Sequence, residues 1–421
     1  MWEKLKQIWK IKDLRNRILF VLAMLVIFRF AAHIPIPGVD AQALQDLFAS
    51  NQILGLINIF SGGSMQNFSI VMMGIAPYIT SSIIFQLLGM IVPKIEEMQK
   101  DESGRQKINN YTRLATVPLA ALQAYGMITL LQRSGYQILG NLGVFDLFSM
   151  IITITAGTIF LMWIGELISE KQVGNGISLL IFAGIISALP STLQQLIINF
   201  DQGQLYLLLG FAVIAIVTVV GVVIINEGQR KIPVQYARQI RGNRAFGGTS
   251  THLPLRVNMA GVIPIIFAIS VLLFPSMIAQ FFISADTSWI ANAAQWTIDI
   301  FENQLVYGVS YFLLVFGFTY FYTEVIFHPD QISENLQKQG GFIPGIRPGK
   351  QTAEYLSNTT HKIIFVGALF LGIIAILPLI MRAFTGVDSL AIGGTSLLIV
   401  VSVIIETVKQ IESQLTMREY E

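Results

Sequence analysis

Apolar runs of about 20 residues recur along the whole chain, and an α-helix needs a run of that length to cross the hydrocarbon of a membrane. Shorter polar segments separate the runs, and a soluble domain does not carry such a pattern. The pattern predicts an all-α polytopic membrane protein. Its ten predicted transmembrane helices cover residues 18–34, 68–92, 114–131, 147–169, 177–200, 205–226, 258–283, 305–327, 363–381 and 392–408.

One apolar segment, residues 54–66, is too short to be a span and is broken at the polar run 61–64. A short helix before a long one is typical of a re-entrant segment at a pathway, where non-helical backbone lies inside protein or against a water-filled cavity. An interfacial helix outside the membrane is the alternative, and the pattern leaves both open. The helix predicted next, 68–92, is expected to turn one side to water or protein because it carries a polar stripe of Tyr78, Thr80, Ser81, Ser82 and Gln86.

The basic residues support this topology. If the N-terminus is cytoplasmic and ten spans follow, the inside segments hold 24 of the 27 Lys and Arg residues, whereas the outside loops hold only Arg133 and Arg382. The remaining one, Arg29, lies within the first span. The positive-inside rule therefore favours ten spans with both termini in the cytoplasm. An eleventh span at 54–66 would reverse every later loop, so this segment is predicted to return to the outer side.

The composition restricts the chemistry. Of 421 residues, 53% are hydrophobic and 12% are charged, and the mean hydropathy is +0.64. The absence of Cys excludes disulfides, thiolate catalysis and cysteine metal sites. The four His residues form no HxxxH or HExxH pattern, and no GxxxxGKS/T phosphate loop occurs. We therefore expect no catalytic residue, no metal site and no cofactor.

Ionisable residues inside the predicted spans are few, and all lie towards helix ends. An ion-coupled transporter generally needs titratable groups near the middle of the membrane, so this scarcity argues against a proton or sodium symporter. The other polar residues in the spans carry hydroxyl and amide groups, which also serve helix–helix packing. The ionisable residues are Arg29, Glu166, Glu324 and Glu406.

Two inside segments, 227–257 and 328–362, are longer than simple connections. The first has six basic residues against one acidic residue, Glu227, and the second contains the Gly- and Pro-rich run 340–349. Solvated loops that only obey the positive-inside rule are the simpler interpretation. Two long basic loops on one side also suit a docking surface for a large, negatively charged partner such as RNA or an acidic protein face. The predicted docking residues are Arg238, Arg241, Arg244, Arg347 and Lys350.

Ten spans divide into two halves of five at the short loop 201–204, which gives residues 1–200 and 201–421. If the halves are structural repeats, an odd number of spans in each requires them to be inverted, with the functional path between them. Residue identity reveals no repeat, so this division follows from geometry alone.

At this level the chain resembles the SecY family, the central subunits of bacterial protein-conducting channels. The likeness extends over nearly the whole chain. Two small departures are Ala76, where Met is expected, and Val173, where Ile is common before Gly-Asn-Gly. The stretches that carry the resemblance are residues 28–38, 58–63, 77–79, 102–105, 174–178, 250–264, 344–349 and 393–399.

The resemblance implies a clamshell of ten helices around an hourglass pore, closed by a ring of apolar side chains and by a re-entrant plug at about 54–66. It implies a lateral gate between helices 68–92 and 114–131 on one side and 258–283 and 305–327 on the other. Two ring pairs are four residues apart, so each lies on one helix face. The implied ring is Ile75, Ile79, Ile177, Ile181, Ile266 and Ile399; the plug includes Ile57, Asn58, Ile59, Phe60, Ser61, Gly62, Gly63 and Ser64; the gate carries Thr80, Gln86 and Asn258.

The same resemblance implies a function in the bacterial inner (cytoplasmic) membrane. The chain would pass unfolded secretory polypeptides through the pore and release apolar segments sideways into lipid. It would break no bond, so the energy must come from partners. The implied partners are the SecE and SecG subunits, the SecA ATPase, the ribosome, signal peptides, unfolded preproteins and membrane lipid. A secondary transporter of a small solute is the alternative, because it also fits the helix count and the broken helix; a membrane protease ranks third.

Overall fold

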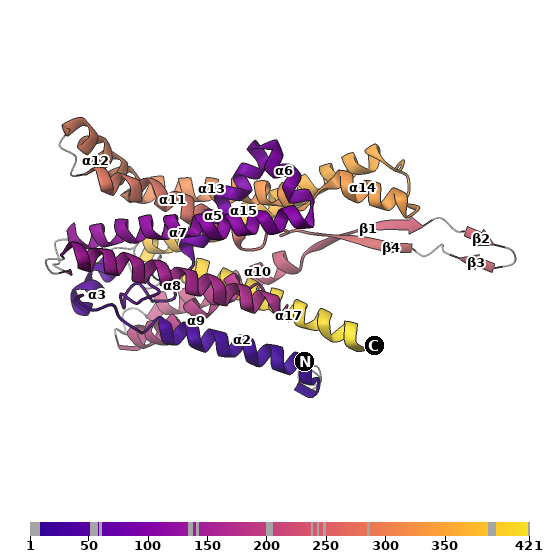
Figure 1. Ribbon diagram of the computed structural model, residues 1–421. Coiled ribbons are helices and arrows are strands. Elements are labelled where there is room, and N and C mark those ends of the chain that lie inside the picture. The colour runs from indigo at the N-terminus through magenta and orange to yellow at the C-terminus, as the bar shows by residue number, and fades with distance from the viewer. Residues whose placement is uncertain are drawn as a thin grey trace.

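The computed structural model describes residues 9–50, 58, 61–133, 138–139, 143–198, 205–236, 239–241, 244–246, 250–283, 287–385 and 393–419. Long helices lie side by side along one direction, and a narrow β-hairpin projects from one end of them (Figure 1). Helix α2 begins and helix α17 ends towards this end, which also carries α14 and is called here the sheet end. The opposite end, where α3 and α12 lie, is called the far end.

The elements before residue 200 are all helical. Helix α6 follows α5 after a single residue, Val92, and begins at Pro93. The axes of the two helices are bent by 111° at this break. Proline is tolerated in the first turn of a helix but cannot continue the preceding one, which explains the bend. The helices are α2 (Lys12–Ala31), α3 (Ala41–Ser50), α5 (Ala76–Ile91), α6 (Pro93–Lys100), α7 (Glu102–Arg133), α8 (Val144–Glu170) and α9 (Gly176–Ile198).

The second part of the chain adds the strands. The helices are α10 (Leu205–Glu227), α11 (Ile263–Phe282), α12 (Ser288–Glu302), α13 (Gln304–Ile326), α14 (Pro329–Lys338), α15 (Lys350–Thr385) and α17 (Gly393–Glu419). The strands are β1 (Gln229–Tyr236), β2 (Gln239–Arg241), β3 (Arg244–Phe246), β4 (Ser250–Arg256) and β5 (Gly341–Phe342).

Each of the ten predicted spans overlaps one of these helices. By length and composition, four helical stretches among the described residues suffice to cross a membrane, or up to five if the bent pair α5–α6 counts as one span. They are Glu102–Gln132, Val144–Glu170, Gln304–Lys338 and Lys350–Met381. The chain is therefore mostly helical with several membrane-length helices, and the count of ten stays a prediction.

Two predicted helices begin later than expected. Helix α5 starts at Ala76 instead of residue 68, and α11 starts at Ile263 instead of residue 258. Both starts have the same construction: a glycine with positive φ (Gly74, 56°; Gly261, 64°), one capping residue, and a proline at the second helical position. Only glycine adopts this backbone region without strain, and proline suits a first turn, so both helices are forced to begin there.

The predicted loop 227–257 is largely a β-hairpin, which the sequence analysis missed. Strand β1 pairs antiparallel with β4 from Gln229↔Arg256 to Gln235↔Ser250, and β5 adds on the other side of β1. Burial alternates along β1, where Ile232 and Val234 are buried and their neighbours are exposed. This period of two was visible in the sequence as a strand signal. The hairpin thus holds its tip away from the helices (Figure 1).

Glycine allows the closest backbone contacts in the first half of the chain. A Cβ on Gly176 of α9 would overlap the carbonyl oxygen of Gly165 in α8, and one on Gly157 would overlap the carbonyl oxygen of Ile70. Backbones in membranes approach this closely only where side chains are absent. These contacts press α9 and the segment 61–75 against α8 and so position the site described next.

Candidate functional site: an apolar constriction with a sealing segment

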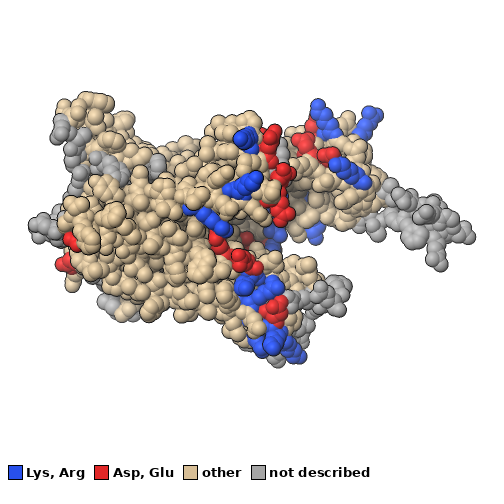
Figure 2. All heavy atoms as spheres, in the orientation of Figure 1, with Lys and Arg blue, Asp and Glu red and all other residues tan. Residues whose placement is uncertain are grey.

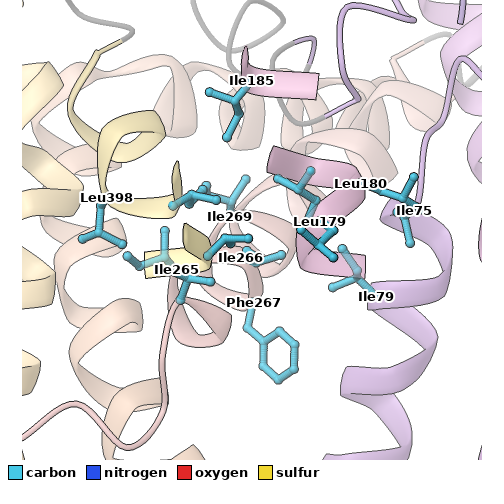
Figure 3. Close-up of a cluster of buried hydrophobic side chains, with 14 of the residues drawn as sticks. Ile75, Ile79, Leu179, Leu180, Ile185, Ile265, Ile266, Phe267, Ile269 and Leu398 are labelled. Atoms are coloured by element: carbon cyan, nitrogen blue, oxygen red, sulfur yellow. The ribbon is translucent and has the colours of Figure 1, made fainter. Parts of the chain in front are cut away.

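The six predicted ring residues come from the start of α5 and from α9, α11 and α17, and they lie in or against one large hydrophobic cluster, to which α2, α8, α10, α13 and α15 also contribute. Ile399 is 0% exposed, Ile181 3%, Ile75 6%, and Ile79 and Ile266 9% each, whereas Ile177 packs against the cluster partly buried. Figure 3 shows Ile79 of α5, Leu179 of α9 and Ile266 of α11 close together, with Leu398 of α17 beyond them. The structure therefore brings together side chains from both halves of the chain.

The cluster is larger than the predicted ring. Leu179, Leu180 and Ile185 of α9 and Ile269 of α11 are also buried in it (Figure 3). Two of these residues could have been predicted from the sequence spacing. Ile185 follows Ile181 by four residues and Ile269 follows Ile266 by three, and such spacings place each pair on one helix face. The buried aliphatic side chains of α9 and α11 therefore extend along both helices beyond the predicted ring.

The segment 61–75, called here the sealing segment, has no helix and is held by its own hydrogen bonds. The hydroxyl of Ser64, which is fully buried, lies 2.7 Å from the carbonyl oxygen of Ser61 and 3.1 Å from that of Val71. The Asn58 side chain accepts a hydrogen bond from the backbone N–H of Gln66 at 3.0 Å. Of the predicted plug, Asn58, Ser61, Gly62, Gly63 and Ser64 thus form a compact turn, and Ile57, Ile59 and Phe60 lie outside the described residues.

Helix α2 grips the sealing segment through Arg29. Its guanidinium Nη1 donates to the carbonyl oxygen of Gly62 at 2.8 Å. Gly62 itself lies between the ring of Phe28 and the backbone of Gly184 in α9, where a Cβ would come within 2.8 Å of the ring and 3.0 Å of Gly184 Cα. In the sequence, Arg29 stands out only as an isolated charge within the first predicted span. Its partner is 33 residues away, and no local pattern reveals it.

The predicted gate residues are not brought together by hydrogen bonds. Helix α11 packs against both α5 and α7, as the predicted gate requires, and α13 packs against α11. Thr80 and Gln86 bond within α5, to the Ala76 carbonyl and the Ser82 hydroxyl. Asn258 instead donates to Asn226 of α10 at 2.7 Å. The seam between α5 and α11 therefore exists, but Asn258 serves a different contact.

Asn258 lines a polar cavity of about 280 Å³ where β4 leads into α11. Asn226 donates in turn to the hydroxyl of Ser402 in α17 at 2.6 Å, so two successive hydrogen bonds link the segment between β4 and α11 to α10 and α17. Arg256 and Glu406 also line the cavity. This arrangement places a recess with several polar residues in its lining next to the start of α11.

The charged residues collect towards the sheet end, and the rest of the face in Figure 2 is almost free of Lys and Arg. Arg347 is exposed on the turn after β5 and Lys350 is exposed at the first residue of α15; glycines with positive φ at 345 (83°) and 349 (96°) shape the turn. The Thr352 hydroxyl donates to the Arg347 carbonyl at 2.9 Å and fixes the turn. Their side chains thus project from a rigid support.

The other predicted docking residues lie at the hairpin tip. Arg241 and Arg244 are paired in the backbone register of β2 and β3, and Arg238 lies outside the described residues. Nearby in α14, Lys338 Nζ lies 2.8 Å from Glu334 Oε1, and this hydrogen bond and charge lower the pKa of Glu334. Lys338 is therefore paired with an acidic residue of its own helix, whereas Arg347 and Lys350 form no ion pair with any described residue.

Among the described residues, no group of three or more His, Cys, Asp or Glu is arranged to hold a metal ion. The described part of the candidate site thus combines a buried apolar cluster, the segment 61–75 and a recess lined by polar residues.

Comparisons with known proteins agree with this geometry. The family model described as SecY matches residues 69–408. Proteins named protein translocase subunit SecY are 44% identical in Halalkalibacterium halodurans, over 100% of this chain and 99% of the relative, and 45% identical in Bacillus subtilis, over 100% and 99%. Two solved structures, described as "The structure of a protein conducting channel" and "Sec61 in the Canine ribosome-channel complex from the endoplasmic reticulum", share the fold. Both have TM-scores of 0.62, at 18% and 17% identity, over 94% of this chain and 91% of theirs. This chain belongs to the SecY family.

Proposed function

We propose that this chain is the channel subunit of a protein translocase, which lets unfolded secretory polypeptides cross the bacterial cytoplasmic membrane and releases apolar segments sideways into lipid. The observation that carries the proposal is that aliphatic side chains of α5, α9, α11 and α17 are buried together within the main hydrophobic cluster. Branched aliphatic side chains in a narrow passage expel water and block ions, yet they can move apart around a polypeptide. The chain supplies no energy source of its own, so it acts as a passive path.

A division into inverted halves, 1–200 and 201–421, follows from the same proposal. The support is local: α5 and α11 begin with the same glycine, capping residue and proline arrangement, and Ile79 and Ile266 each lie two residues after the proline. Matched helix starts in the two halves bring matched side chains to a shared axis. The closure would then be made where the two halves meet.

The proposed partners are the SecE and SecG subunits, the SecA ATPase and the ribosome, with signal peptides, preproteins and lipid as what the channel handles. The support is the concentration of basic residues at the sheet end, which the positive-inside rule assigns to the cytoplasm together with both termini. One structure that shares the fold is itself described as part of a ribosome-channel complex. The sheet end is therefore proposed as the face that receives the motor or ribosome.

The direct test is reconstitution of the chain with its small subunits into liposomes, followed by addition of the ATPase, ATP and a labelled secretory precursor. We expect the precursor to become protected from external protease only when all components are present. Liposomes without this chain are the control. Saturable uptake of a small solute by the chain alone, without precursor protection, would favour a secondary transporter instead.

Loss of the Arg29 side chain should loosen the sealing segment. A hydrogen bond from a charged donor to a carbonyl contributes about 1.5–3 kcal/mol, so Arg29→Met should raise the population of the open state roughly tenfold to a hundredfold. The measurement is the resting ion conductance of the purified complex in planar bilayers. Arg105→Met removes an exposed charge from α7, away from the segment, and should leave the conductance unchanged. Equal conductance in wild type and Arg29→Met would show that the contact does not hold the closure.

A further inference from the structure

Helix α12 (Ser288–Glu302) connects α11 to α13 at the far end of the molecule, opposite the strands (Figure 1). It carries two strongly exposed aromatic residues, Trp289 and Trp296, which are 70% and 67% exposed. They are seven residues apart, so at 3.6 residues per turn they point within about 20° of the same direction. The helix therefore presents one continuous aromatic edge that no described part of the chain covers.

A second edge of α12 packs on the protein. Ala294 and Ile298 are 5% and 8% exposed and form a small cluster with Ala279 of α11. This packed edge lies roughly opposite the two tryptophans on the helical wheel. The aromatic edge is thus not an accidental by-product of the packing, because the core contact of α12 is already satisfied on its other side.

A third edge is polar. Asn292, Gln295 and Asp299 are exposed, and the Gln295 side chain donates to Asp299 Oδ1 at 2.8 Å. On the helical wheel these residues lie to one side, between the packed edge and the tryptophans. Helix α12 therefore has three faces: one packs on protein, one is polar and suits water, and one carries the two tryptophans and suits neither water nor the protein core.

The position of α12 determines what surrounds it. Its neighbours α11 and α13 overlap the predicted spans 258–283 and 305–327, so both ends of α12 lie where the chain leaves and re-enters the membrane. The helix is about 22 Å long, at 1.5 Å per residue, and it is too short and too polar to cross the bilayer. A short helix of this polarity between two predicted spans is suited to the boundary between lipid and water.

We propose that α12 lies in the membrane–water boundary of the leaflet at the far end, with Trp289 and Trp296 inserted among the lipid headgroups and the Asp299 edge in water. Tryptophan favours this layer because its ring is apolar and its indole N–H is polar. Through Ala294, Ile298 and Ala279, the anchored helix holds the far end of α11, the helix that carries Ile266, at a fixed depth. The partner is a lipid surface, and the inference requires only that α11 and α13 span the membrane.

Tryptophan fluorescence tests this directly, because the chain has only five Trp residues. Replacing Trp2, Trp9 and Trp163 with Phe leaves the two on α12. The complex is reconstituted into vesicles of phosphatidylcholine brominated either just below the headgroup or near the chain end. We expect the shallow bromines to quench the emission about twice as strongly as the deep ones, as for a side chain at the headgroup level.

Two single-Trp controls in a background without other tryptophans calibrate the depth. Leu313→Trp, at an exposed site near the middle of α13, should be quenched more by the deep bromines, and Gln331→Trp, on exposed α14, should be quenched by aqueous iodide and by neither lipid. The proposal would be overturned if Trp289 and Trp296 behaved like the α14 control. It would also be overturned if a partner protein shielded them from both iodide and bromine. Failure of the Leu313→Trp control to sense deep bromines would instead contradict the membrane-spanning role of α13.

Discussion

Replacing Ile79 and Ile266 together with Ser is expected to make the resting channel leak ions. Both residues are buried in the apolar cluster, and they come from α5 and α11, which pack against each other. A hydroxyl in this position gives water a hydrogen-bonding partner inside a passage that otherwise expels it, and once water is continuous, ions follow. The effect should be large, because the closure depends on the absence of polar groups at its narrowest point.

The measurement is conductance in planar bilayers without a translocating polypeptide. Ile152→Ser on α8 is the matched control, because Ile152 is 51% exposed and lies outside the cluster. Truncating a buried Ile costs about 2–5 kcal/mol, so co-purification of the small subunits must first show that the double variant remains assembled. An assembled double variant with wild-type conductance would remove these residues from the closure.

Reversing the charge of the docking residues is expected to abolish most export while leaving assembly intact. The variants are Arg347→Glu and the pair Arg241→Glu with Arg244→Glu. Hydrogen bonds to charged groups contribute about 1.5–3 kcal/mol each, so losing one should weaken partner binding roughly tenfold to a hundredfold. Insertion should not suffer, because the remaining Lys and Arg keep each segment basic.

The readout is protease-protected export of a precursor into vesicles, together with partner binding at low and high salt. Arg230→Glu, an exposed residue at the base of the same hairpin, is the matched charge reversal and should retain most export. Normal export by both test variants would refute the docking assignment. A loss that accompanies dissociation of the small subunits would refute it as well, because the defect would then lie in assembly.

The class of the protein and the approximate positions of its helices could be predicted from the sequence. Each predicted span falls on one helix, because a run of apolar residues long enough to cross lipid is a local property that does not depend on distant residues. The stretches that resemble the SecY family were equally local, and the family assignment was confirmed. Four of the six ring positions were also marked by spacing, as the pairs Ile75 with Ile79 and Ile177 with Ile181.

The contacts of individual polar and small residues could not be predicted from the sequence and became clear only in the folded chain. Arg29 meets Gly62 across 33 residues, Asn258 bonds to α10 instead of joining Thr80 and Gln86, and the segment before α5 folds into turns where a helix was predicted. Sequence patterns report the average surroundings of a helix face, whereas a hydrogen bond depends on the positions of two particular atoms. Helix α12 is another case in which the sequence pattern alone does not identify the contacts. A spacing of seven residues puts Trp289 and Trp296 on one helix face, but only the packing of Ala294 and Ile298 on α11 leaves that face exposed.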